Sequence, residues 1–179
     1  EERLKYLGDA YDALGSTYYG FFNYQRAAET FEKVATNPRF SETKRKETAR
    51  NAMVLYASMG QRDKMMNMYR VGAQLKPTPE EKANADFLAA DYDHKQWSPV
   101  GGDGGQNRTT RLAAEQALIG FYTANRGNGA ALKYDLEAVY TVAKMKKSAG
   151  DPGYRVWFKT TIDAWKAMRD RGPVGKDGK

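Results

Sequence analysis

Apolar residues recur at helical spacing along most of the chain, in segments separated by short polar turns. The clearest segment runs from Lys46 to Pro79 and is divided by Gly60. Its apolar and small residues are Ala49, Ala52, Met53 and Tyr56 before this glycine, and Met65, Met66, Tyr69, Gly72 and Ala73 after it. A spacing of three or four residues places such side chains on one face of a helix, and glycine interrupts the pattern. The segment therefore predicts two amphipathic helices joined by a tight turn.

The same alternation predicts three further helix pairs. The four units cover residues 3–38, 46–79, 80–126 and 130–172. In the first, the stretch between Gly8 and Ala27 is about two helical turns longer than in a standard unit, at 3.6 residues per turn. In the third, a glycine-rich loop at residues 98–107 replaces a short turn, and such loops are often mobile. Residues 1–172 are thus expected to form one all-α domain, a solenoid of eight helices in antiparallel pairs.

Several helix ends are marked by residues that cap or stop helices. Thr78 followed by Pro79 and two glutamates predicts an N-terminus, because threonine caps the helix and acids suit its first turn. Ser41 with Lys44 is a second possible N-cap region. Asp151-Pro152 predicts the start of the last helix, and Gly172-Pro173 predicts its end. Residues 173–179 are expected to be a flexible tail or linker.

The order of small, aromatic and glycine positions resembles that of the tetratricopeptide repeat (TPR) family. With Lys46 as the first position of a unit, the family's eight characteristic positions fall on Ala52, Met53, Tyr56, Gly60, Met65, Tyr69, Gly72 and Pro77. Met53, Met65 and Gly72 depart from the usual residues but keep a small or apolar character. The resemblance implies a TPR-like α-solenoid that binds proteins or peptides on its concave face.

A narrower resemblance covers most of residues 6–172. The stretches FNYQRAAETFEKVATNPRFSE, ETARNAMVLYASMG and TPEEKANADFLAADYDHKQW resemble the long TPR proteins of deltaproteobacterial cell envelopes, including those of the myxobacterial gliding-motility machinery. This resemblance implies a scaffold for envelope proteins, in the periplasm or associated with the envelope, although a cytoplasmic location stays open. Because the sequence begins without methionine, we interpret it as a segment of a longer protein.

The resemblance also implies which residues line a partner-binding groove. They are Lys5, Asp9, Asp12 and Ala13 in the first unit, Glu47, Arg50, Asn51, Val54 and Ser58 in the second, and Glu81, Asn84, Leu88, Asp91 and Tyr92 in the third. In TPR proteins that clamp the acidic tail of chaperones, the clamp positions correspond here to Lys5, Asp9, Asn51, Glu81 and Ala85. Only two of these five match, and the added carboxylates would repel a terminal carboxylate. We therefore expect no clamp.

Composition narrows the possible partners. Of the 179 residues, 41% are hydrophobic and 28% are charged, no residue is cysteine, and the net charge is +7. The charge could attract nucleic acid, but acids are interspersed with the bases almost everywhere, and nucleic-acid binding needs a clustered basic face. No apolar run approaches the ~18 residues of a membrane-spanning helix. We expect protein partners, neither nucleic acid nor a transmembrane segment.

No catalytic, cofactor or metal site is apparent. His94 is the only histidine, and its neighbours Asp91 and Asp93 would point to different helix faces. The glycine-rich loop lacks the lysine and hydroxyl residue of a phosphate-binding loop. Tyr18, Tyr19, Phe21 and Phe22 form one dense aromatic cluster, which is either packing within the first unit or a partner patch.

Three functions remain open at this level. The first is a non-enzymatic protein-binding scaffold that uses the groove or the inserted loop. The second is a purely architectural spacer without a ligand. The third, which the pattern favours least, is a helical-repeat enzyme or nucleic-acid binder.

Overall fold

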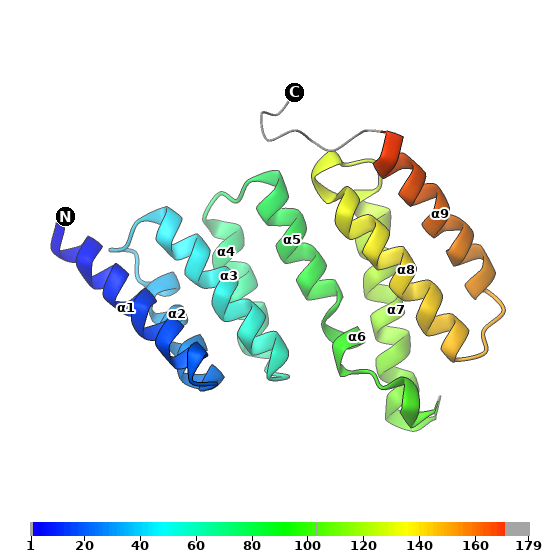
Figure 1. Ribbon diagram of the computed structural model, residues 1–179, viewed down its shortest axis with the longest axis horizontal. Helices are drawn as coiled ribbons and strands as arrows, with labels where there is room; N and C mark the ends of the chain where they lie inside the picture. Colours follow the sequence, from blue (N-terminus) through cyan, green and yellow to red (C-terminus); the bar gives the residue numbers. More distant parts are fainter. Residues whose placement is uncertain (1, 103, 171–179) are drawn as a thin grey trace. The chain divides into compact units, whose positions relative to one another are not determined.

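The computed structural model describes residues 2–102 and 104–170, and their regular structure is entirely helical (Figure 1). The all-α expectation is therefore confirmed, whereas the predicted stop at Gly172-Pro173 and the tail at 173–179 lie outside the described residues. The α-helices are α1 (Glu2–Gly20), α2 (Tyr24–Thr36), α3 (Glu42–Ser58), α4 (Arg62–Gln74), α5 (Pro79–Ala90), α6 (Tyr92–Gln96), α7 (Gly105–Asn125), α8 (Leu132–Ser148) and α9 (Tyr154–Asp170). Two 3₁₀ turns, Pro99–Gly101 and Gly129–Ala131, precede α7 and α8.

The chain divides into two compact units, residues 1–85 and residues 86–179, and the boundary falls within α5. In the first unit, α2 packs against α1, α3 and α4, and α3 packs against α4. The sequence produces this packing because small and apolar residues meet on the facing sides of the helices. The completely buried side chains at these contacts are Ala27, Ala28, Val34, Ala35, Ala52, Tyr56 and Met65.

Helix α1 buries less of its apolar stripe than its pattern predicts. Of the described residues of α1, only Gly8 and Gly15 are buried. Leu7 and Leu14 recur at helical spacing on an apolar stripe, yet they are 46% and 41% exposed. The helix therefore approaches its neighbours through its glycines rather than through its leucines.

Two predicted helix starts are confirmed by their cap hydrogen bonds. The backbone N–H of Glu81 donates to the hydroxyl of Thr78 at 3.2 Å, and the N–H of Thr78 donates to the Glu81 carboxylate at 2.7 Å. This reciprocal pair is a capping box. Ser41 caps α3 with a single bond, since its hydroxyl accepts the N–H of Lys44 at 3.3 Å.

The second unit is built from α6 to α9, together with the last residues of α5. Helix α7 packs against α6 and α8, and α8 packs against α9. The core lies along α8, where Ala138, Val139, Val142, Ala143 and Met145 are completely buried. None of the residues of α9, all of which are described, is buried to that degree.

Two boundaries in this unit differ from the predicted ones. Helix α7 begins at Gly105, inside the loop predicted at residues 98–107, so the inserted loop is shorter than predicted. The Asn107 side chain holds it, accepting the N–H of Ser98 at 3.2 Å and donating to the Ser98 carbonyl at 2.8 Å. Helix α9 begins at Tyr154, two residues after Pro152, because the carboxylate of Asp151 accepts the N–H of Gly153 at 2.7 Å and forms a turn there.

Candidate protein-binding surface

Helix α3 carries the groove residues predicted for the second repeat, and it presents three of them on an outward face. Arg50, Val54 and Ser58 follow one another at intervals of four residues and are all exposed. Such residues lie above one another on a helix. The opposite face of α3 carries Ala52 and Tyr56, which are fully buried. Burial of one face thus fixes which side chains the other face offers to a partner.

Helix α1 contributes acidic side chains beside α3. The Lys44 ammonium lies 2.8 Å from Asp12 Oδ2, 3.8 Å from Asp9 Oδ1 and 3.7 Å from Glu47 Oε2. Its hydrogen bond with Asp12 raises the pKa of Lys44 above the ordinary value, against the opposing effect of burial. Three predicted groove residues are therefore brought together around one lysine that was not predicted to belong to the site.

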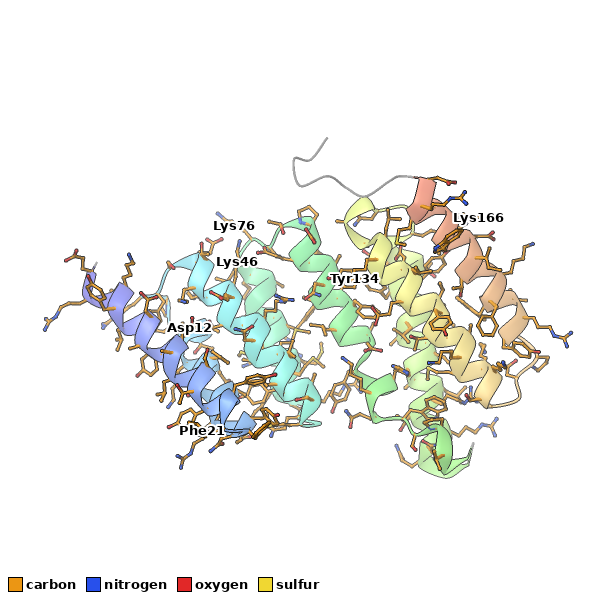
Figure 2. The ribbon with its side chains drawn as sticks, in the orientation of Figure 1. Asp12, Phe21, Lys46, Lys76, Tyr134 and Lys166 are labelled. Atoms are coloured by element: carbon orange, nitrogen blue, oxygen red, sulfur yellow. The ribbon has the colours of Figure 1, made fainter. Side chains whose placement is uncertain are left out.

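The start of α5 is joined to α3 by two further polar contacts. Arg50 donates from Nε to the Asn84 side-chain oxygen at 3.1 Å. The Lys46 ammonium lies 3.8 Å from Glu81 and 3.6 Å from Glu42. Figure 2 labels Lys46 on α3 and Asp12 on α1 of this unit. The predicted residues of α1, α3 and early α5 thus lie on one connected polar surface.

This polar surface has a mixed charge. Its acids are Asp9, Asp12, Glu42, Glu47 and Glu81, and its bases are Lys5, Lys44, Lys46 and Arg50. Many of these charges are paired with one another, so the surface does not form the continuous positive face that a nucleic-acid backbone requires. Exposed Val54, 42% accessible, adds an apolar point at its centre. Asn51 is half-buried beside it, and Lys5 is exposed on α1.

Three groove residues predicted in the third repeat lie in the second compact unit, residues 86–179, and they are less accessible. Asp91 and Tyr92 are each only 6% exposed, and Leu88 is half-buried. The Asp91 carboxylate is occupied by His94 Nδ1 at 2.8 Å and by Lys95 at 3.3 Å. The sequence placed these residues on one helix face but did not reveal that Asp91 and Tyr92 are buried. Asp91 and Tyr92 offer little to a partner in solution.

An apolar groove between α8 and α9 was not predicted from the sequence. It encloses about 540 Å³ and is lined by Leu136, Tyr140, Ile162 and Trp165, with Lys133, Glu137 and Thr161 at its edges. The helical spacing of Tyr140, Ile162 and Trp165 suits packed helix faces, yet they are 46%, 53% and 44% exposed. The exposed apolar stripe arises because α9 touches α8 on one side only.

The chemistry of the described residues matches no catalytic arrangement that we recognise. Among the described residues, no three His, Cys, Asp or Glu side chains come together to hold a metal ion. No helix in the described part of the chain has the length and apolar character needed to cross a bilayer.

The buried charges have structural partners. In the second unit, Arg111 and Glu115 are paired on α7, and Lys146 of α8 lies 3.0 Å from Glu115 and 2.7 Å from Asp151. Burial tends to lower the pKa of Lys146, but its hydrogen bonds with the two carboxylates outweigh this effect and raise it. The cluster ties α7, α8 and the start of α9 together.

Comparisons with protein-family models, with curated proteins and with solved structures gave no significant match to this chain. The polar surface on α1, α3 and early α5 is therefore the candidate site on geometry alone.

Proposed function

We propose that the chain is a non-enzymatic protein-binding scaffold of the TPR type, and that a partner polypeptide binds the outward face of α3 in the first unit. The observation that carries the proposal is the contrast between the two faces of this helix. One face is locked into the core through Ala52 and Tyr56, and the other exposes Arg50, Val54 and Ser58. Such a face is rigid before binding, which lowers the entropy cost of ordering the site.

The chemistry of the face suggests the kind of partner. Arg50 and Lys5 offer cations, Asp9 and Glu47 offer carboxylates, and Val54 offers an apolar contact. A partner segment with both charge signs around one apolar anchor would complement this arrangement, and charge matching of this kind favours specificity and rapid association. As part of the same proposal, the chain belongs to a larger multi-repeat protein of the cell envelope and holds envelope proteins, including those of a gliding-motility complex.

A spacer without a ligand is the second candidate. It is favoured by the pairing of many charges on the surface with one another, for example around Lys44, since paired side chains are already satisfied without a partner. Under that interpretation the ion pairs only join α1 to α3.

A site-specific photocrosslinking experiment distinguishes the two. A photoreactive phenylalanine analogue replaces Val54 in one bait and Arg70, exposed on α4, in the control bait. Both are irradiated in a native cell-envelope extract. We expect adducts that form at position 54 and not at position 70, and the adduct identifies the partner.

The purified partner then allows a quantitative test. Arg50→Glu combined with Asn51→Glu is expected to weaken its affinity by about tenfold or more, because charge repulsion replaces attraction at the centre of the face. The matched variant Asn67→Glu combined with Arg70→Glu makes the same change of charge at two exposed positions on α4, and it is expected to bind like the wild type. Equal binding by all three proteins, or adducts at both positions alike, would favour the spacer.

A further inference from the structure

The turn between α1 and α2 exposes two adjacent phenylalanines. Phe21 is 80% exposed and Phe22 is 78% exposed, and these are the most exposed aromatic side chains in the described part of the chain. Figure 2 labels Phe21 at one end of the first unit, opposite the end where Lys76 is labelled. Two neighbouring phenylalanines in water are costly to hydrate, so a patch of this kind indicates an interaction site.

The turn holds these rings outward by a defined backbone geometry. The N–H of Asn23 donates to the Tyr18 carbonyl at 2.8 Å, and the N–H of Phe22 donates to the Tyr19 carbonyl at 2.9 Å. Asn23 also begins α2 by accepting the N–H of Arg26 at 3.3 Å. Phe22 has a φ of +58°, in the left-handed region where glycine is the usual residue at a helix C-terminus. Phe22 is therefore a large apolar residue at a position whose backbone conformation favours glycine.

Tyrosines surround the two phenylalanines. The ring of Tyr24 lies 6.2 Å from the ring of Phe22 and 5.5 Å from that of Tyr19, between centroids. Tyr19 is 55% exposed and Tyr24 is 36% exposed. The two phenylalanines therefore form an apolar tip. The neighbouring tyrosines each combine an apolar ring with a polar hydroxyl group. Aromatic residues with one apolar and one polar end concentrate at the water boundary of lipid bilayers.

Cations lie at the same end of the first unit. Arg26 is exposed at the start of α2, and its guanidinium carbon lies 5.7 Å from the centre of the Tyr18 ring. The start of α4 is joined to that of α2 by a 2.6 Å hydrogen bond from Gln61 to Gln25. Arg62 and exposed Lys64 follow Gln61, with Asp63 as the acid between them. The nearby acids of α2, Glu29 and Glu32, are half-buried and accept hydrogen bonds from Gln25 and Tyr56. The exposed charges around the aromatic tip, three cations and one acid, are therefore net positive, which complements anionic lipid headgroups.

We propose that the α1–α2 turn docks on the surface of an anionic lipid bilayer, with Phe21 and Phe22 inserted among the acyl chains. Tyr19 and Tyr24 then lie at the headgroup level, and Arg26 and Lys64 face the lipid phosphates. Arg26 and Lys64 lie over the rings of Tyr18 and Tyr56 but have exposed side chains. These cations favour this occupant over an apolar protein surface, which would offer them no anion. This is peripheral membrane binding, because only the tip of the turn enters the bilayer. It is separate from partner binding on α3.

Insertion is tested with a tryptophan placed at the tip. Phe21→Trp is mixed with vesicles of equal parts phosphatidylcholine and phosphatidylglycerol, in which the acyl chains of one lipid carry bromine as a fluorescence quencher. The wild-type protein, which has its own three tryptophans, gives the background signal. We expect additional quenching in Phe21→Trp relative to the wild type. The control Val156→Trp, at a 66% exposed position on α9, is expected to add none.

Binding itself is measured by sedimentation with the same vesicles lacking bromine. Phe21→Ser combined with Phe22→Asn should lower the partition coefficient by about tenfold or more, since the area of two phenylalanine rings no longer leaves water. Asparagine suits the left-handed backbone at position 22, and circular dichroism checks the fold. Val156→Ser combined with Ile162→Ser removes comparable exposed apolar area elsewhere and should leave the partition coefficient unchanged.

The exposed cations predict that binding depends on the charge of the lipids and on the salt concentration. Vesicles of phosphatidylcholine alone, or a high salt concentration, should weaken binding, because salt screens the attraction between exposed charges. Arg26→Gln combined with Lys64→Gln should remove most of the preference for anionic vesicles. Absence of wild-type binding to any vesicle, or equal binding by the double phenylalanine variant, overturns the proposal. Arg50→Glu on α3 should bind vesicles like the wild type, so failure of the scaffold proposal would not affect this result.

Discussion

A methyl group at Gly15 would lie 2.6 Å from the Cε1 atom of Phe31. Carbon atoms without a bond between them normally remain about 3.5–4.0 Å apart, so the helix α1 can lie this close to α2 only because residue 15 has no side chain. Phe31 is itself buried on α2, with 5% of its surface exposed. The pair therefore sets the distance between the first two helices.

Substitution Gly15→Ala should destabilise the first unit. Either the rigid ring of Phe31 or the whole of α1 must shift, and overpacking of this kind typically costs about 1–3 kcal/mol. Urea unfolding followed by circular dichroism measures the change in the free energy of unfolding. The matched control is Gly72→Ala in α4, where an added Cβ would meet nothing within 4 Å. Alanine favours helix over glycine, so the control should gain up to about 1 kcal/mol; a loss in both variants would contradict the close-approach argument.

Tyr56→Phe tests the polar contact within the core of the same unit. The Tyr56 hydroxyl donates to Glu32 Oε2 at 2.5 Å, and the tyrosine is fully buried. Loss of a hydrogen bond to a charged group should cost about 1.5–3 kcal/mol. Thermal or urea unfolding at neutral pH measures this cost. Tyr11→Phe, on a half-buried tyrosine of α1, is the control and should have a smaller effect.

The same tyrosine should make the stability depend on alkaline pH. Burial, followed by the hydrogen bond to Glu32, raises the pKa of Tyr56 well above the ordinary value of 10.0. Above pH 10 the unfolded chain loses this phenolic proton while the folded chain keeps it, so the stabilisation is complete below that pH and declines as the pH rises further. Unfolding free energies measured at increasing pH should fall less steeply in Tyr56→Phe than in the wild type. Parallel curves would show that Tyr56 ionises equally in both states.

The local signals were sufficient to predict most helices and several of their ends. The threonine cap at Thr78 and the break at Gly60, whose φ is +71°, depend on neighbouring residues alone. Boundaries determined by side chains farther away were missed. Asn107 shortens the inserted loop by binding Ser98, nine residues earlier in the chain. Periodicity contains no information on such contacts.

The candidate surface shows the same limit. A helical period places Arg50, Val54 and Ser58 on one face of α3, and they are exposed together. It cannot distinguish exposure from burial for Tyr92, because burial depends on which elements pack nearby. Likewise, the apolar residues Ile162 and Trp165 fit a packed face equally well, yet they are exposed on α9. Lys44 was missed because its three carboxylate neighbours come partly from α1, far away in sequence.

Glu115→Gln tests the buried charge cluster of the second unit. Glu115 is 4% exposed and pairs with Arg111 and with Lys146. The amide keeps the shape but removes the negative charge, so two cations remain in the interior with less compensation, at a cost of about 3–5 kcal/mol. Unfolding by urea measures the loss. Glu137→Gln, at an exposed position on α8, should change the stability by less than about 0.5 kcal/mol, and an equal effect at both positions would contradict the role of burial.

Phe22 offers a test of backbone strain that is independent of lipid binding. Its φ of +58° lies in the left-handed region, which costs a residue with a Cβ atom about 1–2 kcal/mol and costs glycine little. Phe22→Gly and Phe22→Ala both remove the ring and its contact with Tyr24, so their difference isolates the backbone term. We expect the glycine variant to be more stable than the alanine variant by about 1 kcal/mol, measured by urea unfolding. The same pair at Phe21, which carries no positive φ in the structure, should show the reverse order or no difference, because glycine has the larger entropy in the unfolded chain. If alanine proves the more stable at position 22 as well, the turn does not hold Phe22 in a strained conformation.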